Sequence, residues 1–159
     1  MRSPIVFNTS DYCSLATSVA KRFNLEIGRL TRRTFPDGER YLKIDSDLSE
    51  RAVILVGGMI DDRSTLELYD LACAAVKYGA LRLDLCIPYF GYSTMERATL
   101  PGEVVTAKTR ARLLSSIPPA SQGNHVHLLD LHSEGIPHYF EGSVTAAHLT
   151  ARSLSLIHI

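Results

Sequence analysis

Two kinds of apolar pattern alternate along the chain. Residues 52–56 form a continuously apolar run, typical of a strand covered on both faces of a parallel sheet, and residues 5–7 and 81–87 are predicted as further strands. Between these strands, segments of about a dozen residues repeat their apolar side chains at helical spacing. Strands that alternate with helices in this way predict an α/β fold with a mostly parallel, doubly wound sheet flanked by helices.

Three helices are predicted, near residues 10–23, 61–78 and 106–117. Each has an apolar side that is expected to pack against the sheet. The apolar side of the first comprises Leu15, Val19 and Phe23 with Ala16 and Ala20 beside them, and that of the second includes Leu66, Leu68 and Leu71. Gly79 follows the second helix, where a C-terminal cap is expected.

A turn is predicted at residues 34–40, because Pro36 presets one backbone dihedral and Gly38 supplies the permissive one. Before the turn lies a connector with some strand character, and after it a half-exposed strand. The turn is open to two interpretations. It is a plain surface turn, or it holds a purine by stacking on Phe35, with Asp37 and Glu39 accepting hydrogen bonds from an exocyclic amine.

Residues 125–131 alternate apolar with polar or ionisable side chains, which predicts a strand. Asp130 and His132 come at its end, two residues apart and therefore on one face. Ligands bind at the carboxyl ends of strands in open α/β sheets, so this pair is a candidate site for a divalent cation or a phosphate-bound metal. A buried Asp–His pair that serves only as a structural hydrogen-bond anchor remains an alternative.

Further loops carry candidate chemistry. The aromatic residues at 88–92 either cover the end of the sheet or form the rim of a ligand pocket. The two glycines at 57–58 indicate a close approach of the backbone to another group. Thr106, Lys108 and Thr109 either hold an anion at a helix N-terminus or simply cap the helix. The remaining histidines are interpreted as structural; they are His125, His127, His138, His148 and His158.

Composition narrows the class of protein. Lys plus Arg and Asp plus Glu number 17 each, so the net charge is zero and no basic stripe indicates a nucleic-acid-binding protein. No apolar run approaches the length of a membrane helix, and the N-terminal run is too short for a signal peptide. Three scattered cysteines fit a reducing compartment, so a cytoplasmic protein is expected. The length predicts one domain, at residues 1–150, followed by an unassigned tail at 151–159.

Four segments, taken in order, resemble the N-terminal half of the ribose-phosphate pyrophosphokinases (phosphoribosyl pyrophosphate synthetases). Residues 35–39 match the family's Phe-x-Asp-Gly-Glu loop, and residues 87–92 match its Ile-Pro-Tyr-Phe-Gly-Tyr motif. Residues 106–108 match the start of its next helix, and residues 129–132 match its Asp-Leu-His signature. The resemblance extends over roughly residues 5–150.

The resemblance implies a phosphoribosyltransferase-like fold and transfer of the β,γ-diphosphate of ATP to the 1-hydroxyl of ribose 5-phosphate. It implies that Phe35, Asp37, Gly38 and Glu39 bind adenine across a subunit interface of a homo-oligomer. Arg97 is assigned to ATP binding as well. Mg²⁺ is the implied cofactor, with Asp130 and His132 beside the ion that bridges the ATP phosphates.

The chain also departs from the family pattern. Thr94 and Met95 stand where the family has an Arg and a Gln that contact ATP, and Thr145 stands where it has an Asp. The family's ribose-5-phosphate loop, catalytic Lys and Arg and further metal-binding Asp belong to its second half, so no catalytic residue is assigned here. We therefore expect the 159 residues alone to be inactive. The alternative function is that of a catalytically silent member that binds nucleotide or a catalytic subunit and regulates it.

Overall fold

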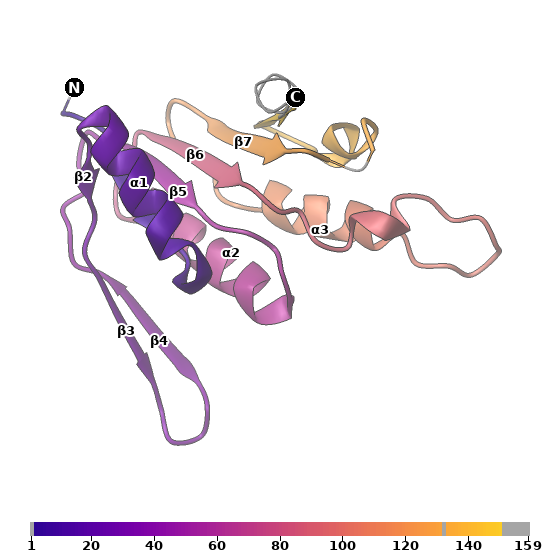
Figure 1. Ribbon diagram of the computed structural model, residues 1–159, viewed down its shortest axis with the longest axis horizontal. Coiled ribbons are helices and arrows are strands. Elements are labelled where there is room, and N and C mark those ends of the chain that lie inside the picture. The colour runs from indigo at the N-terminus through magenta and orange to yellow at the C-terminus, as the bar shows by residue number, and fades with distance from the viewer. Residues whose placement is uncertain (1, 132, 151–159) are drawn as a thin grey trace, which may run out of the picture.

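A computed structural model describes residues 2–131 and 133–150, which form a six-stranded sheet with helices on both faces (Figure 1). Every neighbouring pair in this sheet is parallel, in the order β2-β1-β5-β6-β7-β8. Its strands are β1 (Ile5–Asn8), β2 (Glu26–Ile27), β5 (Ala52–Val56), β6 (Arg82–Ile87), β7 (Asn124–Leu129) and β8 (Val144–Leu149). The predicted α/β fold with a mostly parallel, doubly wound sheet is confirmed.

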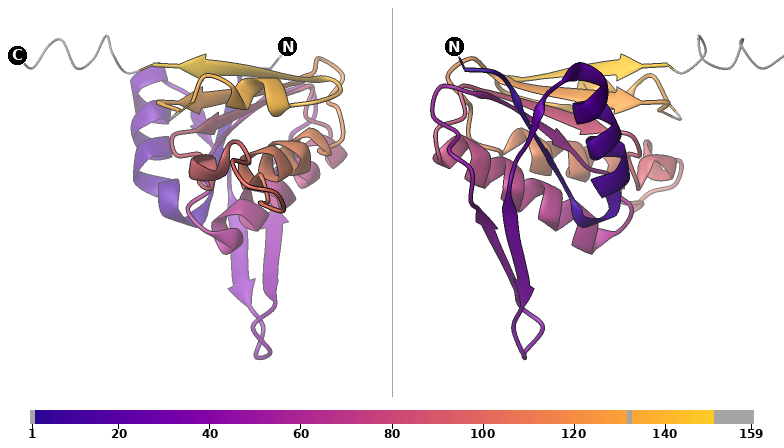
Figure 2. Two further views of the ribbon diagram at one scale, coloured as in Figure 1. Left: turned by 90° about the vertical axis from the view of Figure 1, so that its right-hand side faces the viewer. Right: turned by 60° about the vertical axis from the view of Figure 1, so that its left-hand side comes forward.

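The direction in which the strands are added decides which face each helix covers. Helix α1 (Cys13–Phe23) follows the short 3₁₀ turn η1 (Ser10–Tyr12) and connects β1 to β2 on one side of it. Helices α2 (Asp62–Lys77) and α3 (Thr106–Ser115) connect β5, β6 and β7 in the opposite direction. Because parallel crossovers are right-handed, α1 lies on one face and α2 and α3 lie on the other (Figure 2).

Two apolar clusters of different size hold the helices. The larger joins α2 and α3 to the sheet, and the smaller joins α1 to β1 and β5 through Ala16 and Ala20. The predicted apolar side of α1 was therefore partly wrong, because Leu15 and Phe23 are exposed. Alanine lets this helix approach the sheet closely, so the larger side chains are left at the rim. Leu66 of α2 is also exposed, while Leu68 is fully buried.

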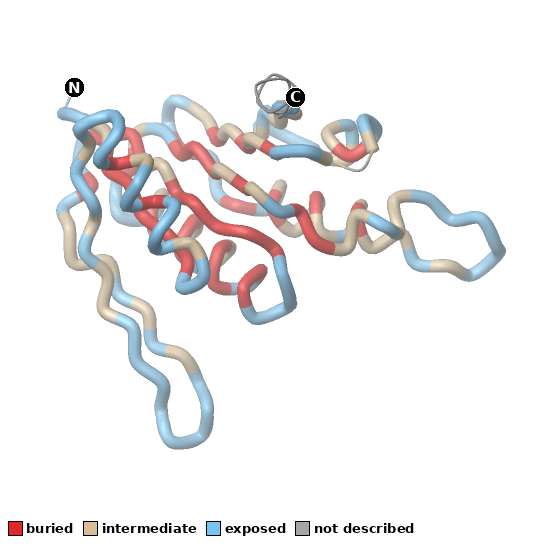
Figure 3. Tube along the Cα trace, viewed as in Figure 1, coloured by how far each residue is buried: buried red, intermediate tan, exposed pale blue. Residues whose placement is uncertain are grey.

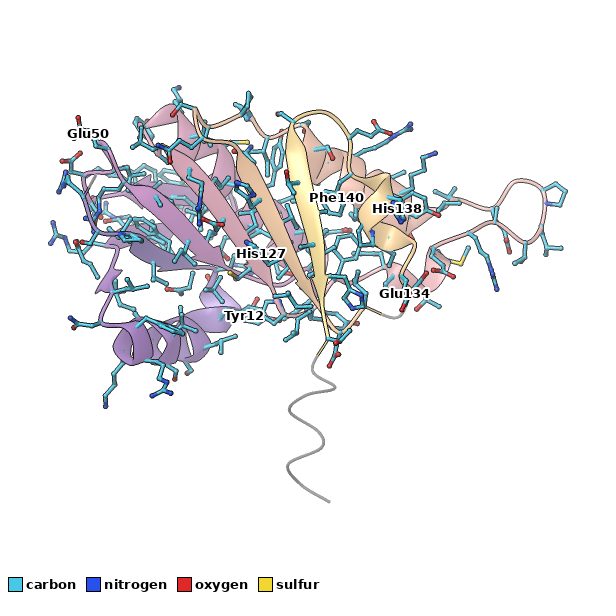
Figure 4. All side chains as sticks on the ribbon, turned by 90° about the horizontal axis from the view of Figure 1, so that it is seen from above. Tyr12, Glu50, His127, Glu134, His138 and Phe140 are labelled. Atoms are coloured by element: carbon cyan, nitrogen blue, oxygen red, sulfur yellow. The ribbon has the colours of Figure 1, made fainter. Side chains whose placement is uncertain are left out.

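The face that carries α1 is open over the other half of the sheet. Among the described residues, no helix lies over β7 and β8 on this side, where His127 is seen (Figure 4). His127 Nε2 lies 3.1 Å from Asp84 Oδ1, and Arg82 Nε donates to Asp84 Oδ2 at 2.7 Å. His127 is thus a strand residue, as interpreted from the sequence, with a carboxylate partner on the neighbouring strand.

An antiparallel hairpin projects from the body of the molecule (Figures 1 and 2). It consists of β3 (Leu30–Thr34) and β4 (Arg40–Ile44), and the turn predicted at 34–40 forms its tip. Figure 3 shows its distal half exposed, in contrast to the buried central strands. The half-exposed strand after the turn is confirmed, whereas pairing with the preceding connector was not predicted.

Two elements near the end of the described chain were not predicted from the sequence. They are the 3₁₀ turn η3 (Ile136–Tyr139) and the edge strand β8, which pairs with β7 along its whole length. The tail at 151–159 lies outside the described residues. None of the described helices combines the length and the hydropathy that crossing a membrane requires.

Candidate functional site

The loops at the carboxyl ends of β6 and β7 enclose a cavity of about 330 Å³. Two segments that are about 40 residues apart in sequence therefore meet here, as expected for the carboxyl edge of a parallel sheet. The cavity is lined by Pro88, Tyr89, Phe90, Ser93, Thr94, Leu129, Asp130 and Leu131. It combines aromatic walls with two hydroxyls and one carboxylate.

Asp130 lies directly after β7, where the sequence predicted it, and its backbone has a positive φ of 47°. Its N–H donates to the Leu149 carbonyl at 2.9 Å, and the next N–H, of Leu131, donates to His148 Nε2 at 3.0 Å. The end of β8 thus fixes the turn that presents the Asp130 side chain. His132, the second predicted metal ligand, lies outside the described residues.

His148 was interpreted as structural, and its structural role lies beside the candidate site. Its imidazole Nε2 accepts a backbone hydrogen bond from the turn after β7. The only signal in the sequence was a polar residue in a weakly apolar segment, and the pairing of that segment with β7 gives the residue its role.

The aromatic loop after β6 fits both interpretations that were left open. Phe90 is buried and its ring centroid lies 6.3 Å from that of Phe140, so it covers the end of the sheet. Tyr89 is 55% exposed and forms part of the cavity rim. Gly91 allows the loop to pass close to its neighbour, because a Cβ there would lie 1.9 Å from the Met59 carbonyl oxygen.

Tyr92 orients the segment that follows this loop. It has a φ of 63°, and its hydroxyl donates to Asp62 Oδ1 at 2.7 Å. This hydrogen bond to a carboxylate raises the pKa of the Tyr92 hydroxyl. Arg110 stacks on the ring at 4.4 Å and donates to the same Asp62 oxygen at 2.7 Å. The cluster of Tyr92, Asp62 and Arg110 holds the start of η2 (Ser93–Met95), so Thr94 borders the cavity.

The start of α3 is not capped by a Thr side chain, and anion binding there stays a prediction. The N-cap position is Val105, and Thr106 Oγ1 donates instead to the Tyr92 carbonyl at 3.3 Å. Lys108 lies over the ring of Tyr139, 5.9 Å from its centroid. These side chains tie α3 to the loops beside it.

The glycines at 57–58 do allow a close approach, and the groups approached belong to the protein itself. A Cβ at Gly57 would lie 2.6 Å from the Thr9 side chain, and one at Gly58 would lie 2.3 Å from the Tyr12 hydroxyl. The bare backbone is therefore explained by packing between the loops after β1 and β5.

Arg97 lies on a loop that projects beyond η2 (Figure 1). The Tyr139 hydroxyl donates to the Glu96 carbonyl at 2.6 Å and fixes the base of this loop. Farther out, Glu103 Oε2 accepts hydrogen bonds from the backbone of Thr99 and Leu100, at 2.7 and 3.0 Å. Arg97 itself is exposed and does not line the cavity beside Asp130.

The predicted adenine-binding residues form the tip of the hairpin, away from the cavity. The Glu39 N–H donates to Asp37 Oδ1 at 3.0 Å, and the Phe35 N–H donates to the Glu39 carbonyl at 2.8 Å. Gly38 has a φ of 91°. Phe35 is 46% exposed and meets Tyr41 edge to face at 6.1 Å. One chain therefore presents its candidate site residues in two separate places.

The chain matches known proteins over most of its length. Residues 5–117 match the family model described as the N-terminal domain of ribose phosphate pyrophosphokinase. A ribose-phosphate pyrophosphokinase of Methanothermobacter thermautotrophicus is 32% identical over 146 residues, which is 91% of this chain and 49% of that protein. The Fusobacterium nucleatum protein of the same name is 28% identical over 138 residues, covering 86% and 42%.

A solved structure shares the fold. Phosphoribosylpyrophosphate synthetase from Mycobacterium smegmatis superimposes with a TM-score of 0.84 at 21% sequence identity. The match covers 97% of this chain and 50% of that structure. The chain therefore spans about half the length of the relatives it matches.

Proposed function

Because the chain belongs to the ribose-phosphate pyrophosphokinase family, we propose that it supplies the ATP-binding half of a ribose-phosphate diphosphokinase. The reaction transfers the β,γ-diphosphate of ATP to the 1-hydroxyl of ribose 5-phosphate and releases AMP. The proposed substrates are thus ATP and ribose 5-phosphate, and the proposed location is the cytoplasm. The observation that carries this proposal is the cavity at the carboxyl edge, which two of the family's motifs line together.

The residues of the cavity fit Mg²⁺ with bound phosphate. Mg²⁺ is usually held by one or two carboxylates together with water and substrate phosphates, and the Asp130 side chain borders a cavity with that kind of room. Asp130 would hold the ion, with His132 beside it. The ion would supply positive charge to the phosphate oxygens during transfer.

The chain's own residues would then position the nucleotide. The Ser93 and Thr94 hydroxyls can donate to phosphate oxygens, and the aromatic wall limits access of water. The Asp130 turn is fixed by two backbone hydrogen bonds, so the carboxylate needs little reorganisation when the nucleotide binds. Positioning is the main task of a protein in phosphoryl transfer.

The hairpin supplies the adenine end of the site in this proposal. Its tip carries an exposed aromatic ring and two carboxylates, but it projects away from the body of its own chain (Figure 2), and no tip residue lines the cavity beside Asp130. A second copy of the chain would bring the tip to the cavity. The proposed assembly is therefore a homo-oligomer in which Phe35, Asp37, Gly38 and Glu39 of one subunit bind the adenine of the ATP in its neighbour's site, and Arg97 contributes to ATP binding.

Product analysis tests the proposal directly. The complete protein is incubated with ATP, ribose 5-phosphate and Mg²⁺, and the nucleotides are separated by chromatography. AMP formed in equal amount with phosphoribosyl pyrophosphate is expected, and none from residues 1–159 alone. Release of ADP would contradict diphosphoryl transfer. Binding of Mg–ATP without turnover by the complete protein would favour the silent regulatory member instead.

A further inference from the structure

A second cavity, of about 210 Å³, lies between the middle and outer part of the hairpin strands and the start of α2. Its wall includes four arginines and one carboxylate. These are Arg32 and Arg33 of β3, Arg40 of β4, and Arg63 and Glu67 of α2. Four guanidinium groups against a single carboxylate leave an excess of positive charge around a small space.

One oxygen of the Glu67 carboxylate accepts three hydrogen bonds from within the protein. Glu67 is only 4% exposed, and its Oε1 accepts hydrogen bonds from the backbone and the hydroxyl of Ser10 at 3.1 and 2.9 Å. Arg32 Nε donates to the same oxygen at 2.9 Å, and Arg32 Nη2 donates to the Asn8 carbonyl. Arg32 therefore neutralises Glu67 and still has N–H groups left, since a guanidinium carries five.

Arg40 and Arg63 form fewer or longer contacts than Arg32. Arg40 Nη1 donates to the Arg63 carbonyl at 2.9 Å, while its contacts with the carboxylates of Glu67 and Asp70 are long, at 4.0 and 3.9 Å. The Arg63 guanidinium has no hydrogen bond and no ion pair within residues 2–131 and 133–150. Guanidinium groups from β4 and α2 thus border one cavity, and they have N–H groups left that can donate to a ligand.

We propose that this cavity is a binding site for a tetrahedral oxyanion of the phosphate class, held by Arg32, Arg40 and Arg63. Guanidinium donors match the oxygens of such an ion, and they stay charged at every physiological pH. The space is below the range of about 300–1,000 Å³ that holds drug-sized ligands, which favours a single phosphoryl group over a whole nucleotide. The site is separate from the cavity beside Asp130, with which it shares no residue.

The phosphoryl group is that of free phosphate or of a sugar phosphate, and an adjoining cavity distinguishes the two. This cavity of about 350 Å³ shares Ser10, Arg63 and Glu67 with the first and is also lined by Asp11 and Asp61. Carboxylates there accept hydrogen bonds from hydroxyls but repel a second anion. Free phosphate would occupy the arginine side alone, whereas a sugar phosphate would extend its hydroxyls toward the acidic side.

Isothermal titration calorimetry on the complete protein, at constant ionic strength, tests the site with inorganic phosphate as the probe. Arg63→Gln removes the guanidinium that has no partner, so the fold is expected to be unchanged. Loss of a charged hydrogen-bonding group predicts at least about tenfold weaker phosphate binding. Arg40→Gln is a second variant with the same expectation. Lys43→Gln is the matched control, because it removes a positive charge from the same hairpin at an exposed position outside the cavity.

The results divide cleanly. Weaker phosphate binding by Arg63→Gln, with Lys43→Gln equal to the parent, would support the site. Equal losses of phosphate affinity in Arg63→Gln and Lys43→Gln would contradict a specific site and indicate general attraction by surface charge. Absence of phosphate binding by the parent protein would overturn the proposal. With ribose 5-phosphate as a second probe, tighter binding than phosphate that is lost in Arg63→Gln supports a sugar phosphate as the source. Equal or weaker binding supports the free ion.

Discussion

The carboxyl edge of the sheet and the tip of the hairpin carry chemical groups of similar kind in different settings. At the edge, Asp130 is placed by backbone contacts with β8, and Tyr92 is placed by side chains of α2 and α3. At the tip, Asp37 closes only its own turn, through Glu39. The edge is built by residues that are distant in sequence, and the tip by residues that are adjacent.

Substitutions at the edge and at the tip should therefore have different effects. A change at the edge acts on the surrounding loops as well as on any bound ligand. A change at the tip has few contacts within its own subunit to disturb, so its effect should be confined to ligand or partner binding. Substitutions in both regions, compared in stability and in activity, test this separation.

The largest effect is expected for Asp130→Asn. Asparagine keeps the size of the side chain and tolerates the positive φ of 47°, so only the negative charge is removed. If Asp130 holds Mg²⁺ and phosphate, kcat of the complete protein should fall on the order of 100-fold or more. Steady-state AMP production measures the loss, and the melting temperature measured in parallel separates loss of the charge from an effect on the surrounding loops. Full activity would remove Asp130 from the site.

Phe35→Ala should come next, with an effect on ATP binding alone. Loss of base stacking is worth about 1–3 kcal/mol, so KM for ATP should rise about 10- to 100-fold while KM for ribose 5-phosphate is unchanged. Because the ring is 46% exposed, the melting temperature should stay within about 1 °C. A fall in stability comparable to that of a core substitution would show that the tip is not independent of the body.

Oligomers that mix two variant subunits test whether the tip and the edge act together across a subunit interface. An oligomer that combines Phe35→Ala and Asp130→Asn subunits contains some sites with an intact tip from one subunit and an intact edge from the other. Activity in the mixture should therefore exceed that of either variant alone. Activity no higher than the mean of the two would place the tip and the edge in the same subunit or in different functions.

A smaller gain is expected from Thr94→Arg combined with Met95→Gln. Thr94 is exposed and borders the cavity, so a longer side chain can enter without displacing the core. One added charge-assisted contact predicts about tenfold lower KM for ATP. Arg97→Gln should raise KM in the parent and have little effect in this variant, if Arg97 acts in place of the missing arginine. Equal effects of Arg97→Gln in both backgrounds would contradict that role.

The smallest effect compares two aspartates by thermal unfolding. Asp61 Oδ1 accepts a 2.7 Å hydrogen bond from the Ser64 N–H as the N-cap of α2, and this bond lowers the pKa of the Asp61 carboxyl. Asp61→Ala should lower the melting temperature by about 2–4 °C at neutral pH. Asp37→Ala should leave it unchanged, because that residue caps no helix. Equal shifts for the two would end the distinction between edge and tip.

The difference in stability between the parent and Asp61→Ala should depend on pH, because the pKa of the Asp61 carboxyl is lowered in the folded state. A carboxyl group whose pKa is lower in the folded state stabilises the fold above its unfolded pKa of about 3.9. That contribution is lost as the pH falls through the lower folded pKa. The parent and Asp61→Ala should therefore differ most above about pH 4 and converge in stronger acid, which scans at several pH values would show.

Local patterns predicted the parts of the fold that local sequence controls. The buried run at 52–56, the start of α2 near residue 61 and the end of β7 before Asp130 all lie where the periodicity and the turn residues indicated. The prediction for α1 was incomplete because spacing alone cannot show whether alanine or a larger apolar residue faces the sheet. In the structure, Ala16 and Ala20 face it.

Long-range pairing explains most of what was missed. Strand β8 has no strong apolar alternation, and it is a strand because β7 offers an edge for it. His148 and Arg110 gain their positioning roles only from such contacts, with Leu131 and Asp62 respectively. The resemblance implied that the adenine-binding residues act across a subunit interface, whereas periodicity and spacing alone gave no sign that one chain would hold its two candidate regions apart.

The Arg32–Glu67 ion pair in the middle of the hairpin has a mechanical consequence. Arg32 is the third of the five residues of β3, so Phe35 lies about 10 Å farther along the hairpin. A tilt of roughly 10° about this pair would carry Phe35 through about 2 Å. The alignment of the ring at the tip thus depends on the stiffness of a half-buried ion pair.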